Sequence, residues 1–153
     1  MSAKRLRDSA PSGDFPKEAA FQQMFNETMS MHMPLQHAVI PELNTRAVDP
    51  QDPSKQVTGE LDFYVNGDVQ WCVEFDRKGD EIGQHLGRFC GENGKYRKVE
   101  TKDYYVVDCR GPKQGGGVKL VHQHRCTLYF STDFTTCRCE IKGEEGVDIE
   151  LQM

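Results

Sequence analysis

Residues 59–75 read GELDFYVNGDVQWCVEF and decide the fold. Apolar residues alternate with polar ones up to Val65, and the alternation resumes at Val69. A period of two residues is typical of a strand with one face in the core. The Asn66-Gly67-Asp68 segment between the two runs is a turn signal. The stretch therefore predicts an antiparallel hairpin with a three-residue loop, in which Val65 pairs with Val69 and Asp62 lies opposite Cys72.

The predicted register gathers carboxylates on one face of the hairpin. They are Glu60, Asp62, Glu74 and Asp76. Asp62 and Glu74 become diagonal neighbours at about 7 Å, close enough to share a divalent cation. Carboxylates side by side repel one another unless a cation neutralises them, and Mg²⁺ prefers oxygen ligands. A two-residue Asn-Gly loop would instead send Asp62 and Glu74 to opposite faces. A solvated acidic face of a half-exposed sheet is the alternative interpretation.

The segments before the hairpin predict a lead, a helix and a short strand. We expect residues 1–15 to be a flexible lead and Lys17 to Met31, after Pro16, to be a helix. The apolar side chains of this helix recur at helical spacing, with Glu18, Gln22 and Asn26 on its other side. Ala38 to Leu43 predicts a short strand, and Asn44 to Thr58, which is polar and contains two prolines, predicts a loop.

The segments after the hairpin predict a helix and several strands. Asp80 is a capping residue for a helix with an apolar stripe of Ile82, Leu86 and Phe89, closed by Gly91 and Gly94. Tyr104 to Cys109 is nearly continuously apolar, which is typical of a central strand buried on both faces. Further strands are expected at Val118–Val121, Arg125–Phe130, Thr136–Ile141 and Val147–Leu151. The predicted order is helix, strand, hairpin, helix, strand, with a β-rich C-terminal addition, in one α+β or α/β domain.

Length, charge and cysteine content narrow the class of protein. The 153 residues suit one domain, and no apolar run approaches the roughly 20 residues that cross a bilayer. Several of the six cysteines fall in strand-like runs, which favours unpaired thiols in a reducing compartment. The net charge of −5 argues against nucleic acid as a partner. A nuclease, however, needs only a local basic rim, which residues 95–102 offer unless they form an ordinary solvated loop.

The hairpin and the following helix carry a resemblance to a known family. Gly59–Val65, Trp71–Phe75 and Gly79–Phe89 resemble the C-terminal effector region of Crinkler-type proteins, which is similar to the restriction-endonuclease-like PD-(D/E)xK nucleases. Fainter likeness extends back to Ala20–Gln22 and forward through Tyr104–Asp108 and Phe130–Phe134. The resemblance implies a single restriction-endonuclease-like domain over residues 16–153. It further implies a phosphodiesterase on DNA or RNA that uses Mg²⁺ or Mn²⁺.

The resemblance also assigns roles to residues. Asp62 and Glu74 take the places of the two metal-binding acids of the motif, but Asp76 stands where the motif has a lysine. Arg77 or Lys78 is expected to supply the missing cation, and strand alternation favours Lys78 if the strand continues that far. His85 and Arg88 are expected to contact phosphate from the helix, unless they form an ordinary polar helix flank.

Location and domain context follow from the same family. Family analogy points to the cytoplasm or nucleus, possibly of a host cell after secretion, with a host protein as a possible partner and no membrane association. Crinkler-like proteins carry a trafficking header and often an NTPase-like domain, neither of which fits into the short lead. We therefore expect a stand-alone effector domain or a part of a longer protein.

Two other functions are open on the sequence. His122, His124 and Cys126 alternate, so a strand would put them on one face, and Cys137 and Cys139 add two thiols. These are zinc ligand types, although the knuckle spacing of structural zinc sites is absent. Alternatively, the chain is a catalytically degenerate nuclease fold that acts as a binding or host-interaction module, as the missing motif lysine and the acidic net charge suggest.

Overall fold

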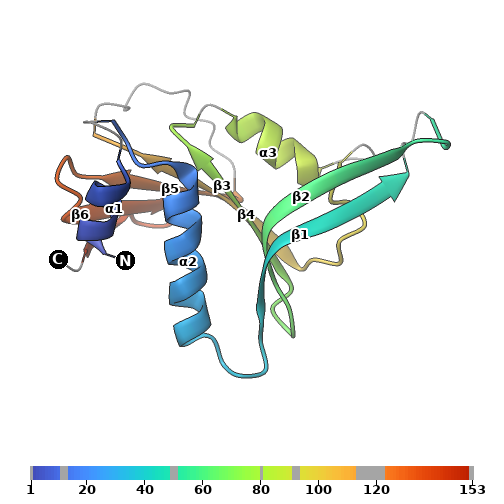
Figure 1. Cartoon of the computed structure of the whole chain (residues 1–153), viewed down its shortest axis with the longest axis horizontal. Helices are drawn as coiled ribbons and strands as arrows, with labels where there is room; N and C mark the ends of the chain where they lie inside the picture. The colour runs from blue at the N-terminus through green and yellow to red at the C-terminus, as the bar shows by residue number, and fades with distance from the viewer. Residues whose placement is uncertain are drawn as a thin grey trace.

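The computed structural model describes residues 2–10, 14–48, 52–79, 81–90, 94–112 and 123–151. These residues form three helices and one seven-stranded sheet, whose strands follow one another in chain order (Figure 1). The elements are α1 (Ala3–Ser9), α2 (Glu18–His32), β1 (Val39–Val48), β2 (Gln56–Val65), β3 (Trp71–Arg77), α3 (Ile82–Phe89), β4 (Asp103–Arg110), β5 (Arg125–Phe130), β6 (Thr136–Ile141) and β7 (Val147–Glu150).

The sheet is mixed. β1, β2 and β3 pair antiparallel, β3, β4 and β5 pair parallel, and β5, β6 and β7 pair antiparallel. The parallel step from β3 to β4 needs a crossover, which α3 provides. From α2 to β4 the order is helix, strand, hairpin, helix, strand, as predicted, and the strands after β4 form the expected β-rich addition. The prediction of a mixed α and β fold is confirmed.

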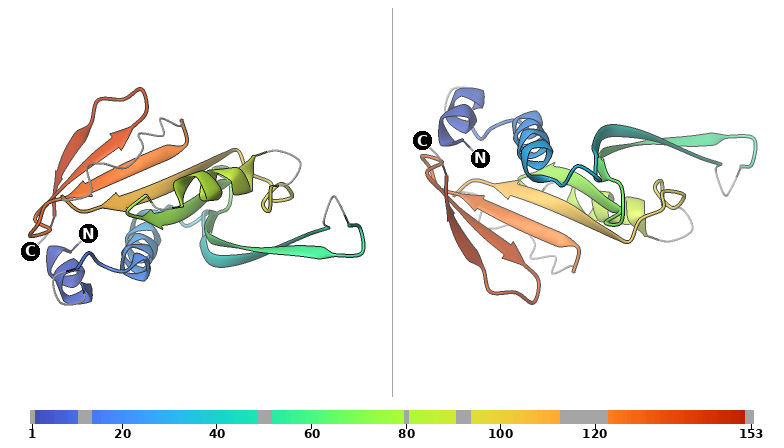
Figure 2. Two further views of the ribbon diagram at one scale, coloured as in Figure 1. Left: turned by 90° about the horizontal axis from the view of Figure 1, so that it is seen from above. Right: turned by 90° about the horizontal axis from the view of Figure 1, so that it is seen from below.

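The helices cover opposite faces of the sheet, which we call the α2 face and the α3 face (Figure 2). On the α2 face, the apolar stripe of α2 supplies Phe21 and Met24 to the main core, and Phe25 packs on Phe63 and Phe75. On the α3 face, Ile82 and Leu86 pack on Val106 of β4. The strands therefore bury apolar side chains on both faces of the sheet, one face under α2 and the other under α3.

The N-terminal segment differs from the prediction of a flexible lead. Residues Ala3–Ser9 form α1, whose Ala3 and Leu6 are completely buried in the main core. Phe15 follows, and its ring stacks on Phe21 with centroids 5.4 Å apart. The two buried residues of α1 are separated by charged ones, so the short helix leaves only a weak apolar pattern in the sequence.

The predicted loop at residues 44–58 is wrong over most of its length. β1 continues to Val48 and β2 begins at Gln56, so the two strands form a long antiparallel arm that projects from the body of the molecule (Figure 1). Most of the arm's described side chains are exposed, although Thr45 is buried and its hydroxyl donates to the carbonyl of Gly59 at 3.1 Å. A strand that is solvated on both faces lacks the alternation by which sequence patterns reveal strands.

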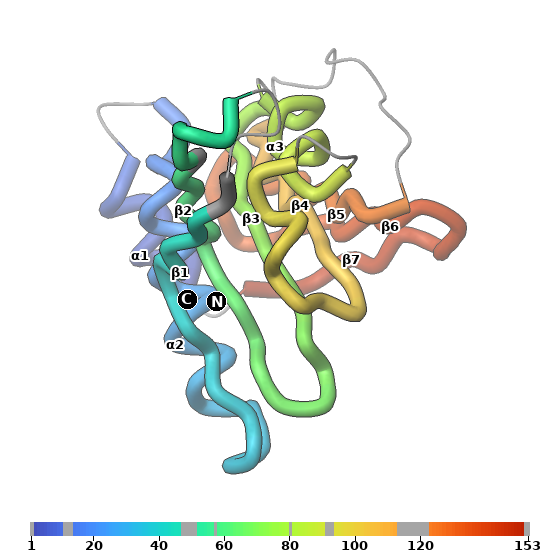
Figure 3. The backbone as a smooth tube through the Cα atoms, turned by 90° about the vertical axis from the view of Figure 1, so that its right-hand side faces the viewer, coloured from blue at the N-terminus to red at the C-terminus, as the bar shows by residue number. Residues whose placement is uncertain are grey.

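The hairpin of β2 and β3 forms, but its register differs from the prediction by two residues. Val65 pairs with Trp71 rather than Val69, so the connection has five residues (Figure 3). Gly67 and Gln70 both take positive φ in this connection, and the side chain of Asn66 accepts a hydrogen bond from the amide of Ala38 at 2.6 Å. A shift of two by itself keeps every side chain on its face. Glu60 and Asp62 nevertheless border a cleft with α2, whereas Glu74 contacts α3, so the predicted common face of the carboxylates does not form as a whole.

The remaining predictions of elements have mixed outcomes. The helix at α3 and the strands at β4, β5, β6 and β7 agree with their predicted ranges to within a few residues. Asp80, Gly91 and the expected strand at 118–121 lie outside the described residues. All six cysteines are unpaired, as predicted. Of the described helices, none has the length and apolar character to cross a membrane.

Candidate functional site

A bend in β2 at Asp62 creates the candidate site. Leu61 packs with Tyr96 and Cys72 on the α3 face, whereas Phe63 packs with Phe75 on the α2 face. Residues two apart in a regular strand share a face, so the strand is twisted between them. On the facing strand β1, Glu42 adopts a φ of 52° at the same level.

The bend leaves one edge of β3 without a strand partner. β2 pairs with β3 only through Phe63, Tyr64 and Val65. From Glu74 to Arg77, β3 pairs with β4 but has no partner on β2 among the described residues. Acidic side chains from β2, β3 and α2 occupy this opening.

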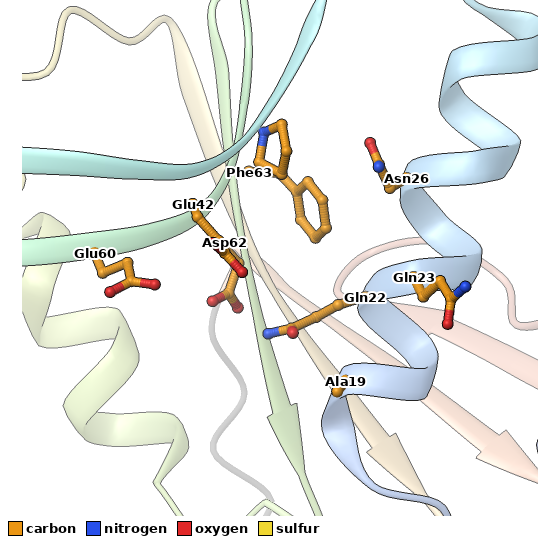
Figure 4. A pocket seen from close by; sticks show the side chains of 9 residues that line it. Ala19, Gln22, Gln23, Asn26, Glu42, Glu60, Asp62 and Phe63 are labelled. Atoms are coloured by element: carbon orange, nitrogen blue, oxygen red, sulfur yellow. The ribbon is translucent and has the colours of Figure 1, made fainter. Parts of the chain in front are cut away.

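Asp62 lies at the centre of the opening. Its Oδ2 accepts a hydrogen bond of 2.6 Å from the amide of Phe75, in place of a backbone carbonyl of β2. The side chain borders a cleft of about 440 Å³ between α2 and the arm, and Figure 4 shows Gln22 extending from α2 toward it. Burial raises the pKa of Asp62 to about 6, with a further rise from Glu74 that the Phe75 amide partly offsets.

Glu18, in the first turn of α2, belongs to the same acidic cluster. Burial raises its pKa to about 7, and the charges of Asp62, Asp76 and Glu74 add to this rise. Gln22 Nε2 donates to Glu18 Oε1 at 3.0 Å. The sequence analysis did not identify Glu18 as a site residue. The helical spacing did place it on the polar side of α2, and in the structure that side of the helix borders the opening as well as solvent.

Asp76 occupies the position where the motif has a lysine. The residue is 4% exposed, and its Oδ1 accepts from the amide of Arg77 at 2.8 Å. Its Oδ2 is buried without a close hydrogen-bond donor in the described part of the chain, although the backbone of Glu81 also stabilises the carboxylate and lowers its pKa. Burial raises the pKa of Asp76, and the neighbouring carboxylate of Asp108 raises it further. A buried carboxylate oxygen without a donor is costly, because nothing replaces the water that it has lost.

Glu74 is completely buried and has partners on both oxygens. The hydroxyl of Tyr96 donates to Oε1, and Arg88 Nη1 donates to Oε2 at 2.6 Å. His85 Nδ1 also lies 2.6 Å from Oε2. Burial lowers the pKa of His85, but the hydrogen bond with Glu74, aided by the nearby acids, raises it above its ordinary value.

The structure therefore brings Glu74, His85 and Arg88 into contact, and the charges of Glu74 and His85 act on nearby Asp62. His85 and Arg88 bind a carboxylate, and their predicted contact with phosphate stays a prediction. Tyr96 was not anticipated. It reaches Glu74 from the segment between α3 and β4. The two residues are 22 positions apart in the sequence, so no local pattern predicts their contact.

Arg77 and Lys78 point elsewhere. Both bind Asp14, through Arg77 Nη2 at 3.2 Å and Lys78 Nζ at 3.3 Å, and Arg77 also donates to the carbonyl of Phe15 at 2.7 Å. β3 ends at Arg77, and Lys78 has a φ of 68°, so strand alternation does not carry Lys78 to the acidic face. The strand ends before Lys78, so the condition under which alternation favoured Lys78 is not met.

The predicted zinc face does not form as proposed. His124 lies before β5 and stacks on Tyr104 of the α3 face, whereas Cys126 faces the other side of the sheet with its Sγ 3.6 Å from that of Cys139. His122 is outside the described residues. Within the part of the chain that the structure describes, no three His, Cys, Asp or Glu side chains are arranged to hold a metal ion.

Comparisons with models of protein families, with curated proteins and with solved structures found no match to this chain. No relative therefore assigns a role to any of these residues.

Proposed function

We propose that the chain is a metal-dependent nucleic-acid phosphodiesterase with a restriction-endonuclease-like core. The order of elements from α2 to β4 is the order that the resemblance to PD-(D/E)xK nucleases implies. Asp62 and Glu74, which match the motif's acids, lie at the opening where β2 leaves β3. The helix that begins the core contributes Glu18 to the same place.

One observation carries the proposal: in the described part of the chain, Asp76 Oδ2 is buried without a close hydrogen-bond donor, beside the carboxylates of Glu18 and Asp108 that repel it. A divalent cation would satisfy this oxygen and relieve the repulsion. Mg²⁺ usually binds through one or two carboxylates and keeps several waters, so a set of three protein ligands is not required. Asp62 and Asp76 fit this role better than the predicted pair of Asp62 and Glu74, because both oxygens of Glu74 are engaged.

The other side chains then have supporting roles. When bound, Mg²⁺ or Mn²⁺ supplies an activated water and stabilises charge on the phosphoryl group. Glu74 fixes the positions of His85 and Arg88, which hold positive charge beside the acidic cluster. This charge favours the approach of a phosphodiester to a site that would otherwise repel it.

Cleavage and metal binding test the proposal together. We expect the purified chain to cleave single-stranded or duplex DNA or RNA with Mg²⁺ or Mn²⁺ but not with EDTA, and to bind Mn²⁺ in a paramagnetic resonance titration. Asp62→Asn and Asp76→Asn should abolish both. Glu42→Gln is the matched control, since Glu42 borders the same cleft but is exposed. Cleavage that persists in Asp62→Asn would refute the assignment.

A second candidate is a degenerate nuclease fold that binds nucleic acid or a host protein without cleaving it. It is favoured by the engagement of Glu74 with Tyr96 and Arg88, and by the pairing of Arg77 and Lys78 with Asp14. Asp76 occupies the motif's lysine position, and the ion pairs with Asp14 keep Arg77 and Lys78 from replacing that lysine. Absence of both Mn²⁺ binding and cleavage in the parent protein would select this candidate.

A further inference from the structure

A second cleft, of about 410 Å³, lies on the α3 face beside the start of β4. Three rings from different parts of the chain form a stack along it: Phe89 of α3, Tyr104 of β4 and His124 before β5. The Phe89 and Tyr104 centroids are 4.3 Å apart at 11°, and those of Tyr104 and His124 are 4.0 Å apart at 25°. All three are half-buried and border the cleft, together with the ring of Tyr96.

Basic residues outnumber acids beside these rings, although Asp103 also lines the cleft and pairs with His124 Nδ1 at 2.9 Å. The segment from Gly94 to Lys102 carries four basic residues and one acid in a chain whose net charge is −5. Arg97 and Lys102 line the cleft, and Lys98 is exposed next to Arg97. The basic segment is thus a local exception to the acidic surface, and it lies where aromatic rings are accessible.

We propose that this cleft binds single-stranded nucleic acid, with a base packed against the rings and the backbone phosphates against the basic segment. Stacking on aromatic side chains together with a cationic groove is how proteins hold unpaired strands. Bases in a duplex are stacked on each other and cannot reach such rings. A volume of about 410 Å³ suits a small ligand or one to two nucleotides rather than a double helix.

The cleft is linked to the acidic site through Tyr96. Tyr96 borders the cleft, while its hydroxyl lies within hydrogen-bond distance of two acceptors, Glu74 Oε1 and the carbonyl of Glu60, and donates its one hydrogen to either. A strand held in the cleft therefore lies next to the cluster of carboxylates. The inference rests on the proposed function for its biological meaning, but strand binding itself does not require cleavage.

Fluorescence anisotropy with labelled oligo-dT, oligo-rU and a duplex of equal length, in EDTA, tests the inference. We expect both single strands to bind more tightly than the duplex, with an affinity that falls as salt rises. His124→Ala should weaken single-strand binding by about fivefold or more, the lower end of what stacking on one ring contributes. Lys98→Glu should weaken it without touching the packing, whereas Lys142→Glu, an exposed lysine between β6 and β7, should not.

The outcomes separate this inference from the proposed function. Strand binding that depends on His124 and Lys98, with no cleavage under any metal, supports the cleft and removes the nuclease. Cleavage with unchanged affinity and KM in both variants supports the nuclease and overturns the cleft. Equal binding of the duplex, equal weakening by Lys142→Glu, or no binding in EDTA also overturns it. Lys98→Glu keeps the test decisive if His124→Ala does not fold.

Discussion

Replacing Asp62 by Asn should stabilise the metal-free protein at neutral pH. Burial and neighbouring charge raise the pKa of Asp62 to about 6 from 3.8. Each tenfold change in proton affinity is worth about 1.4 kcal/mol, so the ionised carboxylate costs about 3 kcal/mol, or about 1–2 kcal/mol once solvent screening is included. Asn keeps an oxygen that can accept the hydrogen bond from Phe75, so the variant removes charge with little change in packing.

The sign of the pH dependence follows from linkage. A carboxyl whose pKa is raised in the folded state stabilises the fold fully below 3.8, and this contribution is lost as the pH rises through 6. The difference in unfolding free energy between Asp62→Asn and the parent protein should therefore grow from about pH 4 to about pH 6.5 and level off above it.

Urea unfolding in EDTA across this range measures the difference directly. Glu42→Gln serves as the control, because an exposed carboxylate keeps its hydration when it ionises. Added Mg²⁺ should then stabilise the parent protein near neutral pH but not Asp62→Asn. Parallel curves for the parent protein and Asp62→Asn in EDTA would show that Asp62 carries its charge without cost, and would remove the electrostatic reason for a cation at this place.

Three further predictions concern other parts of the molecule. Glu74→Ala should lower the unfolding free energy by about 3–5 kcal/mol, because it leaves buried donors and positive charge unpaired; a urea titration that shows a loss of less than about 1 kcal/mol would contradict this. Leu6→Ala should cost about 2–5 kcal/mol in the same assay, since Leu6 is completely buried, whereas a flexible segment would give no change. A thiol reagent at neutral pH should label exposed Cys90 first, so Cys90→Ser should remove the fast phase of labelling.

The fold was largely predictable where one face of an element is buried. The alternation around Phe63 and Phe75 predicted the hairpin, and the apolar stripe of α2 predicted its helix. Both patterns arise because these apolar side chains pack in the core. The β1–β2 arm was missed because it is solvated on both faces, and α1 because only Ala3 and Leu6 face inward. In both, pairing or docking with distant residues decides the structure, and local pattern does not record it.

The site was predictable only in part. Strand alternation predicted that Asp62 and Glu74 lie near each other, and they do lie close enough for their charges to interact, but alternation did not predict that Asp62 borders α2 while Glu74 contacts α3. The bend at Asp62 lies opposite Glu42 of the arm, and the partner of Glu74 on Oε1 is Tyr96. These are tertiary contacts. Helical spacing correctly set His85 and Arg88 one turn apart on one side of α3, but it could not show that this side meets Glu74.

The charge of the acidic cluster bears on how a nuclease would work here. Glu74 is balanced by Arg88 and His85, so it adds little net charge to the opening. Glu18, Asp62 and Asp76 remain, and a divalent cation balances two of the three. The raised pKa of Glu18, about 7, makes it the carboxyl that keeps a proton near neutral pH. A group that titrates there is suited to transfer a proton, because acid–base catalysis is most efficient when the pKa lies near the working pH. A bound cation offsets the charges of Asp62 and Asp76 that help to raise this pKa, so in the proposed enzyme Glu18 should titrate below 7. Glu18→Gln should therefore leave Mn²⁺ binding intact but remove one ionisation below pH 7 from the pH–rate profile; a profile that is unchanged would limit Glu18 to a structural role.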